Sequence, residues 1–359
     1  MNRGTQALID PSALAHNLQC VRQWAPQALV WAVVKANAYG HGVERAAQAL
    51  HRADGYAVAT LGEAIELRRH QPEHPILLLE GVNRLAQLAQ VADYQIQTVV
   101  HCQEQLDHLR QTDLQRAGAQ PLSVWLKVDT GMHRLGFAPS DLGSARTLLA
   151  GLAGVHLEGV MTHLACADEP NRPDPTEQQL TRFGSCLRPG EQVSIANSAA
   201  VIAWPDTHHD WVRPGIMLYG SSPFAERDGV DLGLRPVMTL TAPVLAVRSV
   251  LAGEAIGYGQ AWRAERDSRI ATLAIGYGDG YPRQAPNGTP IWLNGQTVAL
   301  AGRVSMDMLM VDVTDLAPVA VGDSAELWGA HLSVDRVARA VGTIGYELLT
   351  RLTARVERV

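Results

Sequence analysis

The chain has 359 residues, of which 47% are hydrophobic and 18% are charged, so it can bury a sizeable core and its length suggests about two domains. A formal net charge of -6 gives no basic surface for nucleic acid, and no apolar stretch is long enough to cross a bilayer. The N-terminal stretch lacks the continuous apolar region of a signal peptide, and we therefore expect a cytoplasmic protein. The four cysteines show no metal-ligand or disulfide spacing, so we expect no metal site.

The first two thirds of the chain alternate short β-rich runs with Ala- and Leu-rich stretches whose apolar spacing suits amphipathic helices. The runs are continuously apolar rather than alternating, which is typical of parallel strands buried on both faces. Eight such units predict a closed (β/α)8 barrel of the TIM type, with a doubly wound sheet as the less favoured alternative. The eight predicted strands cover residues 30–34, 56–60, 76–79, 97–100, 123–128, 157–163, 192–196 and 215–220.

The pattern changes in the last third of the chain. A polar segment rich in glycine and proline, 221–236, is followed by short alternating runs separated by turn signals, with no helical pattern before 333–342. We therefore predict a barrel over residues 10–225 and a smaller, mostly β domain over residues 226–359. Residues 1–9 contain a strand-like run that we expect to pair with one of the two domains, the second being the candidate.

Polar side chains gather at the ends of the predicted barrel strands. They are Lys35, Lys127, His163, Asn197, Ser198 and Arg213, the last lying just before the predicted eighth strand. Strand ends of this kind share one rim in a barrel, and barrel enzymes hold their active sites there. Each residue taken alone is equally well a solvated strand terminus, but their convergence favours a site.

Lys35 directly follows the apolar run WAVV in the stretch VVKANAYGHG. A lysine at a dry rim is a candidate Schiff-base nucleophile, because desolvation favours its neutral amine. An ion pair at the barrel end and a lysine that extends its ammonium group to water are the ordinary alternatives. Asn197, Ser198 and the backbone of Gly215 and Ile216 belong to the last two predicted units, the usual position of a phosphate site in barrels. An imine-forming lysine and a phosphate site together predict pyridoxal 5'-phosphate as the cofactor.

Nine separated motifs resemble those of the alanine racemase family, in order and over essentially the whole chain. They are VVKANAYGHG, KVDTGMHRLGF, MTHLA, NSAA, WVRPGIMLYG, IGYGQAW, GYGDGYPR, GRVSMDM and TIGYELL. The resemblance implies a pyridoxal phosphate-dependent racemase that interconverts L- and D-alanine, for peptidoglycan synthesis or for alanine catabolism. It also implies a barrel joined to a β domain, and a head-to-tail homodimer in which the second domain contributes to the active site of the partner subunit.

The resemblance assigns two catalytic residues. Lys35 matches the lysine that binds the cofactor and acts as a base on one face of the substrate, and Tyr258 matches the tyrosine that the other subunit supplies to the opposite face. Racemisation needs both, because a single base tends to return the enantiomer that it received. His163 matches the residue that contacts both this tyrosine and the arginine equivalent to Arg213. Without the resemblance, a tyrosine between glycines in a β domain is more often a turn or packing residue.

Further cofactor contacts follow from the same resemblance. Arg213 resembles the arginine that faces the pyridine nitrogen of the cofactor, with an ion pair as its ordinary alternative. Because an arginine only donates, the ring nitrogen stays unprotonated and the cofactor becomes a weaker electron sink. The residues that match the phosphate contacts are Tyr39, Ser198, Gly215, Ile216 and Tyr346, with Asn197 ordering the loop.

The substrate contacts are also assigned by resemblance. Arg134 matches the residue that contacts the cofactor phenolate and the substrate carboxylate, and Lys127 matches a lysine that is often carbamylated in the family. Met306 and Asp307 match residues that the second subunit places near the substrate carboxylate, although core packing is the alternative for Met306. Tyr277 resembles a gatekeeper at the entrance to the site.

Three other functions are compatible with parts of the sequence. A related pyridoxal phosphate decarboxylase of basic amino acids shares the architecture, but should carry a cysteine-containing substrate loop that this sequence lacks. A broad-specificity amino-acid racemase would be favoured by a wider entrance and an export signal. A non-catalytic pyridoxal phosphate carrier would be favoured by a lone barrel without Tyr258. We expect Gly278, which stands where alanine is frequent in the family, to loosen the entrance loop slightly.

Overall fold

The structure, a computed structural model, describes residues 3–112, 114 and 121–359. The chain divides into two compact units. The barrel unit comprises Leu18–Ala38 and Val43–Leu218, and the C-terminal unit comprises Met1–Asn17, Tyr39–Gly42 and Tyr219–Val359. The four-residue insertion Tyr39–Gly42 thus belongs to the C-terminal unit although barrel segments precede and follow it in the sequence.

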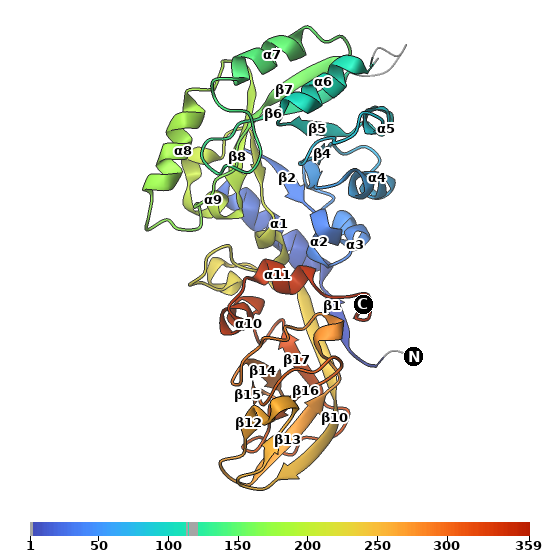
Figure 1. The fold of residues 1–359 in the computed structure, drawn as a ribbon, viewed down its shortest axis with the longest axis vertical. Helices are drawn as coiled ribbons and strands as arrows, with labels where there is room; N and C mark the ends of the chain where they lie inside the picture. The colour runs from blue at the N-terminus through green and yellow to red at the C-terminus, as the bar shows by residue number, and fades with distance from the viewer. Residues whose placement is uncertain (1–2, 113, 115–120) are drawn as a thin grey trace. The chain divides into compact units, whose positions relative to one another are not determined.

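The barrel unit is built on eight parallel strands (Figure 1). They are β2 (Leu29–Val33), β3 (Gly55–Val58), β4 (Ile76–Leu78), β5 (Gln97–Val100), β6 (Leu122–Lys127), β7 (Val155–Met161), β8 (Gln192–Asn197) and β9 (Trp211–Arg213). The strands follow one another in chain order, and β9 pairs with β2 to close the sheet, which confirms the predicted (β/α)8 barrel. All residues of β3 and β4 are buried, as expected for strands covered on both faces.

Helices connect the strands of the barrel unit (Figure 1). They are α3 (Val43–Ala49), α4 (Leu61–His70), α5 (Gln87–Asp93), α6 (Gln103–Gln111), α7 (Leu142–Ala150), α8 (Asp174–Gly184) and α9 (Ser198–Ala203), while α1 (Pro11–Trp24) precedes β2 and begins in the C-terminal unit. Local sequence sets several of their ends. Thr60 and Glu63 form a capping box that begins α4, and the carboxylate of Asp10 accepts the amide of Ser12 at 2.8 Å in the first turn of α1.

The eighth barrel strand lies earlier in the chain than predicted. The sequence places it at 215–220, whereas the structure has β9 at Trp211–Arg213 and a 3-10 helix, η2, at Ile216–Tyr219. A short, continuously apolar run does not distinguish a buried strand from a buried helical turn, and Pro214, which has no N–H to donate, separates the two here. Arg213 consequently ends the strand instead of preceding it, and joins the rim that carries the other polar residues.

The C-terminal unit is mostly β, as predicted, with a main sheet of eight strands. They are β1 (Gln6–Ile9), β10 (Met238–Val250), β13 (Ser268–Leu273), β14 (Pro290–Leu293), β15 (Gln296–Leu300), β16 (Leu309–Asp312), β17 (Ser324–Trp328) and β18 (Glu357–Arg358). Their order is β13-β16-β15-β14-β17-β10-β1-β18, and β13 also pairs with β10, which closes the first six into a ring. β11 (Ala255–Ile256) and β12 (Trp262–Arg263) form a separate antiparallel pair.

The remaining elements of this unit complete the sheet. β1 pairs antiparallel with β10, from Gln6 opposite Thr241 to Ile9 opposite Met238, so the first strand of the chain belongs to this sheet. Two helices lie between β17 and β18 in the chain, α10 (Val334–Val341) and α11 (Gly345–Thr350). Over the described residues, no helix is both long enough and apolar enough to cross a membrane.

Candidate active site

Polar residues singled out in the sequence lie at the carboxyl ends of the barrel strands. Lys127 ends β6, Asn197 ends β8 and Arg213 ends β9. Lys35 and His163 each come two residues after a strand, β2 and β7 respectively. Because the carboxyl ends of parallel barrel strands share one rim, five strands bring these side chains to the same end of the barrel.

The backbone that follows Lys35 is strained. The consecutive non-glycine residues Ala36–Tyr39 have φ angles of 52° to 53°, a left-handed conformation that costs about 1–2 kcal/mol per residue. Such strain persists only where the surrounding structure holds it. Within the barrel unit, the carboxylate of Glu63 accepts the amide of Ala36 at 2.7 Å. Lys35 is therefore held between a buried strand and a backbone turn of fixed shape.

Glu63 is not among the site residues predicted from the sequence. Its second carboxylate oxygen accepts the amides of Ala59 and Thr60, each at 3.0 Å, at the start of α4. One half-buried carboxylate thus joins the start of this helix to the turn after Lys35. The Thr-x-x-Glu spacing of a capping box is visible in the sequence, but nothing in that spacing indicates the contact with Ala36.

Four cationic side chains gather around His163. They are Lys35, Lys127, Arg134 and Arg213. Burial is the main cause that lowers the pKa of His163 well below its ordinary value, and the four charges add to it, so the imidazole is neutral at physiological pH. A cluster of this charge is suited to an anionic ligand. Among the described residues, no group of three or more His, Cys, Asp or Glu side chains is placed to hold a metal ion.

Lys127 is the second perturbed group of this cation cluster. Burial, followed by the charges of Arg213, Arg134 and Lys35, lowers the pKa of Lys127 to about 8. The chain has only two lysines, Lys35 and Lys127, and both belong to the cluster. Apart from histidines, the other basic side chains of the protein are all arginines.

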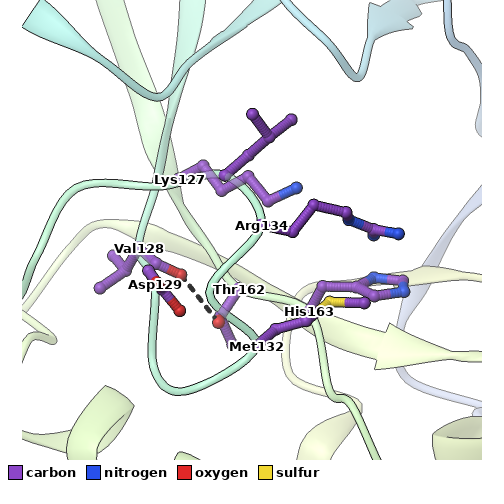
Figure 2. A pocket seen from close by; sticks show the side chains of 8 residues that line it. Lys127, Val128, Asp129, Met132, Arg134, Thr162 and His163 are labelled. Atoms are coloured by element: carbon purple, nitrogen blue, oxygen red, sulfur yellow. Dashed lines mark hydrogen bonds between the residues drawn. The ribbon is translucent and has the colours of Figure 1, made fainter.

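A small pocket lies at this rim, between the loop after β6 and the end of β7. It is lined by Lys127, Val128, Asp129, Met132, Arg134, Leu135, Thr162 and His163. Figure 2 shows the side chains of Lys127, Arg134 and His163 extending in the same direction from the pocket wall. The hydroxyl of Thr162 donates to the carbonyl of Val128 at 2.9 Å and so joins the loop to the strand end.

Buried hydrogen bonds connect the two segments that form the wall of this pocket. Gln179, on α8, donates its amide to the hydroxyl of Thr130 and to the carbonyl of His163, both at 3.1 Å. The hydroxyls of Thr130 and Thr162 lie 2.8 Å apart. These three polar side chains are almost fully buried, and they join the loop that carries Arg134 to the strand end that carries His163. No motif in the sequence indicates the part played by Gln179.

Arg213 is buried, with 5% of its surface exposed. Its Nη1 donates to the hydroxyl of Ser194, and its Nη2 donates to the carbonyls of Thr162 and Ile195. Burial lowers the pKa of Arg213 to about 10, which leaves the group protonated at neutral pH. The Nη2 atom also lies 3.5 Å from Nδ1 of His163. Because a guanidinium only donates, Nδ1 accepts and the neutral ring carries its proton on Nε2.

Ser198 and Asn197 lie where β8 meets α9. The side chain of Asn197 accepts the amide of Ala200 at 3.1 Å and caps the helix. The hydroxyl of Ser198, which is 3% exposed, accepts the amide of Gly215 at 2.8 Å, in the turn that leads to Ile216. The Ser198 hydroxyl thus accepts from the turn after β9 and keeps its own proton, which can be donated to a phosphate group at the ends of the last two strands.

The other predicted site residues lie in the C-terminal unit, where Tyr39 is buried. Its ring stacks on that of Tyr219 with centroids 4.6 Å apart, and lies 6.0 Å from the ring of Tyr346. Burial raises the pKa of Tyr39 above its ordinary value, so the phenol stays protonated and can donate.

Tyr258, Tyr277 and Met306 are exposed on the same unit. Tyr258, in a 3-10 turn, has 72% of its surface exposed, against 53% for Met306 and 37% for Tyr277. The amide of Tyr277 donates to the carbonyl of Ser305 at 3.0 Å, so the predicted gatekeeper lies beside the loop that carries Met306 and Asp307. These side chains present an aromatic and apolar surface to the outside of the unit.

Two family models match the chain. They describe the alanine racemase N-terminal domain, over residues 9–223, and the alanine racemase C-terminal domain, over residues 237–359. The alanine racemase of Stutzerimonas stutzeri is 51% identical over 354 residues, which is 98% of this chain and 98% of that protein. The biosynthetic alanine racemase of Pseudomonas aeruginosa is 50% identical over 354 residues, with the same coverage of both.

Solved structures agree with these matches. The crystal structure of the biosynthetic alanine racemase from Pseudomonas aeruginosa has a TM-score of 0.95 at 50% identity, with 99% of each chain covered. The alanine racemase of Bartonella henselae, solved with covalently bound pyridoxal phosphate, has a TM-score of 0.89 at 32% identity, again with 99% of each covered. The resemblance carried by the nine motifs is thereby confirmed. The chain belongs to the alanine racemase family, whose members interconvert L- and D-alanine.

Proposed function

We propose that this chain racemises alanine with pyridoxal 5'-phosphate bound covalently to Lys35. The observation that carries the proposal is the group of Lys35, Arg134 and Arg213 around a neutral His163, with Lys127 lining the same pocket as Arg134 and His163. The aldehyde of the cofactor needs an amine to bind it, and the ring nitrogen of the cofactor needs a hydrogen-bond donor. The cofactor phosphate and the substrate carboxylate both need cations. This set of donors fits all of them. The Bartonella henselae relative, which holds the cofactor covalently, supports the assignment.

Several residues would hold the cofactor. When bound, the group withdraws electrons from the amino acid, so that the Cα hydrogen becomes acidic. Lys35 would hold its aldehyde carbon, and Arg134 its ring hydroxyl oxygen and the substrate carboxylate. We assign the phosphate, by resemblance, to Tyr39, Asn197, Ser198, Tyr346 and the backbone of Gly215 and Ile216. The meeting of the Ser198 hydroxyl with the Gly215 amide at 2.8 Å supports this part of the assignment.

Arg213 would donate to the pyridine nitrogen. Its pKa of about 10 keeps the guanidinium charged at neutral pH, so it offers a hydrogen-bond donor and no acceptor. Facing such a donor, the ring nitrogen of the bound cofactor would accept and stay unprotonated, and the cofactor would withdraw electrons more weakly. Arg213 thus favours the prompt return of a proton to Cα over slower reactions such as transamination.

Two residues would move the proton, one on each face of Cα. Lys35 serves one face, and Tyr258 of the partner subunit serves the other. A phenol is a weak base at its ordinary pKa of about 10 and needs a donor that stabilises its anion. His163 meets this need, because its neutral ring carries a proton on Nε2 while Nδ1 faces Arg213.

We propose a head-to-tail homodimer with shared active sites. The residues that the resemblance assigns to the other subunit's site are Tyr258, Tyr277, Met306 and Asp307. Three of them are large side chains exposed on the C-terminal unit, as residues that act on another molecule must be. Met306 and Asp307 would lie near the substrate carboxylate, and Tyr277 at the entrance.

We further propose the cytoplasm as the location and D-alanine supply for peptidoglycan as the role, with alanine catabolism as the alternative. The relative from Pseudomonas aeruginosa bears the name of a biosynthetic enzyme, which favours the first role. Neither assignment changes the chemistry at the site.

The test is the circular dichroism of an L-alanine solution incubated with the protein and pyridoxal phosphate. We expect the signal to decay to zero while total alanine stays constant. A signal that persists although cofactor is bound would favour a non-catalytic carrier or a racemase of another amino acid. Repeating the assay with larger and charged amino acids separates an alanine-specific enzyme from a broad-specificity one.

We propose that Lys127 is carbamylated. The negatively charged carbamate would then orient the guanidinium of Arg134. The neutral amine forms a bond to the carbon of CO2 and releases a proton to solvent, and a pKa of about 8 makes this amine accessible near neutral pH. Protein freed of CO2 is expected to lose activity by about tenfold, the effect of one charge-assisted hydrogen bond. At a fixed concentration of dissolved CO2, activity should return faster as the pH rises from about 7 to 9, because the neutral fraction of Lys127 rises through its pKa.

The variant Lys127→Met separates this chemistry from a general effect of bicarbonate. Its activity should not respond to bicarbonate, and the intact mass of the native protein alone should show one added carboxylate group. Equal masses and equal activities of the native protein with and without CO2 would rule the modification out.

A further inference from the structure

Four charged side chains form a cluster on the C-terminal unit, which we call the charge quartet. It consists of Arg3, Asp279, Asp307 and Arg355. Arg355 contacts Asp307 through Nη2 at 2.7 Å and Asp279 through Nε at 3.2 Å. Arg3 contacts the same two aspartates through Nη1, at 3.3 and 3.7 Å. Each arginine thus meets both carboxylates, and the four charges balance.

Asp279 anchors the quartet to the turn of the predicted gatekeeper. It ends the 3-10 turn Tyr277–Asp279, is 2% exposed, and accepts the amide of Gly276 at 2.9 Å. Thr353 also binds this turn, its amide donating to the carbonyl of Asp279 at 3.1 Å. The segment that carries Arg355 therefore binds Asp279 twice. The amide of Thr353 contacts the backbone carbonyl of Asp279, and the guanidinium of Arg355 contacts its carboxylate.

Gly278 provides the space that Arg355 occupies. A Cβ atom at this position would lie 2.4 Å from Nη1 of Arg355 and 3.0 Å from the carbonyl oxygen of Met306. The amide of Gly278 donates to that same carbonyl at 2.9 Å, which joins the turn to the loop of Met306 and Asp307. The absence of a side chain at Gly278 thus admits a guanidinium that contacts Asp279 of this turn and Asp307 of the neighbouring loop.

The position of Asp307 raises an electrostatic problem. In the function proposed above, this aspartate lies near the carboxylate of the substrate, and two like charges at short range repel one another. Both arginines of the quartet bind the same oxygen of Asp307, Oδ1. Arg3 also donates to the backbone carbonyl of Asp307, which fixes the loop as well as the charge.

We propose that Arg355 is a positioning residue of the substrate site, which neutralises Asp307 and fixes its loop against the turn of Tyr277, and so sets the affinity for the amino-acid carboxylate. The proposal rests on the roles proposed above for Asp307, Met306 and Tyr277. Arg355 contacts no reacting atom, and its effect passes through Asp307. Its absence should therefore weaken substrate binding and leave the proton transfers at Cα intact.

The variant Arg355→Gln tests this. We expect the KM for L- and D-alanine to rise by about tenfold, the effect of one lost charge-assisted hydrogen bond, with kcat within about twofold of the native value. Arg355→Lys keeps the charge and should recover most of the loss. The matched control is Arg266→Gln, because Arg266 pairs with Asp315 on the surface of the same unit, outside the quartet, and should leave KM unchanged.

A double-mutant cycle with Asp307→Asn distinguishes charge compensation from loss of structure. Once Asp307 is neutral, Arg355→Gln should change KM by less than about twofold, because there is no longer a charge to compensate. Gly278→Ala, which displaces the guanidinium without removing a charge, should raise KM in the same direction. A native KM in Arg355→Gln, a fall in kcat alone, or effects that simply multiply in the double variant would overturn the proposal. Absence of alanine racemisation in the native protein would instead overturn the function on which it rests.

Discussion

Replacing Lys35 by alanine is expected to abolish racemisation and covalent cofactor binding together. Loss of one acid–base group alone costs about 10²–10⁴-fold in rate, and loss of the covalent attachment adds to it. The visible absorbance of the protein-bound imine should disappear, while pyridoxal phosphate in excess remains free. The strained turn after Lys35 depends on Glu63 and the Ala36 amide rather than on the lysine side chain, so the fold should survive the change.

The two-lysine composition makes this assignment direct to verify. Borohydride reduction fixes the cofactor to whichever amine holds it, and Lys35 and Lys127 are the only side-chain amines in the chain. Peptide mapping should find the reduced cofactor on Lys35 in the native protein and in Lys127→Met. In Lys35→Ala, the one remaining lysine, Lys127, should carry no cofactor. Recovery of the label on Lys127 from the native protein would show that the wrong lysine has been assigned.

Replacing Tyr258 by phenylalanine is expected to leave the cofactor on Lys35 and to slow racemisation by about 10²–10⁴-fold. The two enantiomers have equal free energies, so kcat/KM must fall by the same factor in both directions. The half-reactions should differ, however. In D2O, the enantiomer whose Cα hydrogen faces Lys35 should continue to exchange it, whereas the enantiomer whose Cα hydrogen faces Tyr258 should not.

Proton NMR of each enantiomer in D2O measures these exchange rates separately. Tyr94→Phe is the matched control, because Tyr94 is an exposed tyrosine of the barrel unit that has no assigned role. Exchange of both enantiomers at the native rate in Tyr258→Phe would show that another group serves the face assigned to Tyr258, and the two-base assignment would then be wrong.

The two inactive variants together also test the shared active site. In a head-to-tail dimer of Lys35→Ala with Tyr258→Phe, one site lacks both residues and the other has both. Random exchange of subunits should therefore restore about one quarter of the native activity. A mixture that stays inactive after verified subunit exchange would place Lys35 and Tyr258 of one site in the same subunit.

The barrel was predictable because most of its strands carry their own signal. Runs such as 30–34 and 76–79 are continuously apolar, and they fall within one residue of β2 and β4. The same signal failed at residues 215–220, because an apolar run that forms a buried helical turn has the composition of a buried strand. Burial alone does not specify backbone conformation, and the missing N–H of Pro214 was the feature that marked the boundary.

The sequence by itself determined the chemistry available to this protein: a lysine behind a buried strand, an arginine in the motif of the last barrel strand, and a tyrosine between glycines in the second domain. These are local features, and they were sufficient to identify the family. Only the tertiary structure decided which groups act on one another. The cation cluster around His163, the bond from Glu63 to the turn after Lys35, and the contact of Arg355 with Asp307 join residues far apart in the chain. Their strength depends on distance and burial, which no local pattern of residues records.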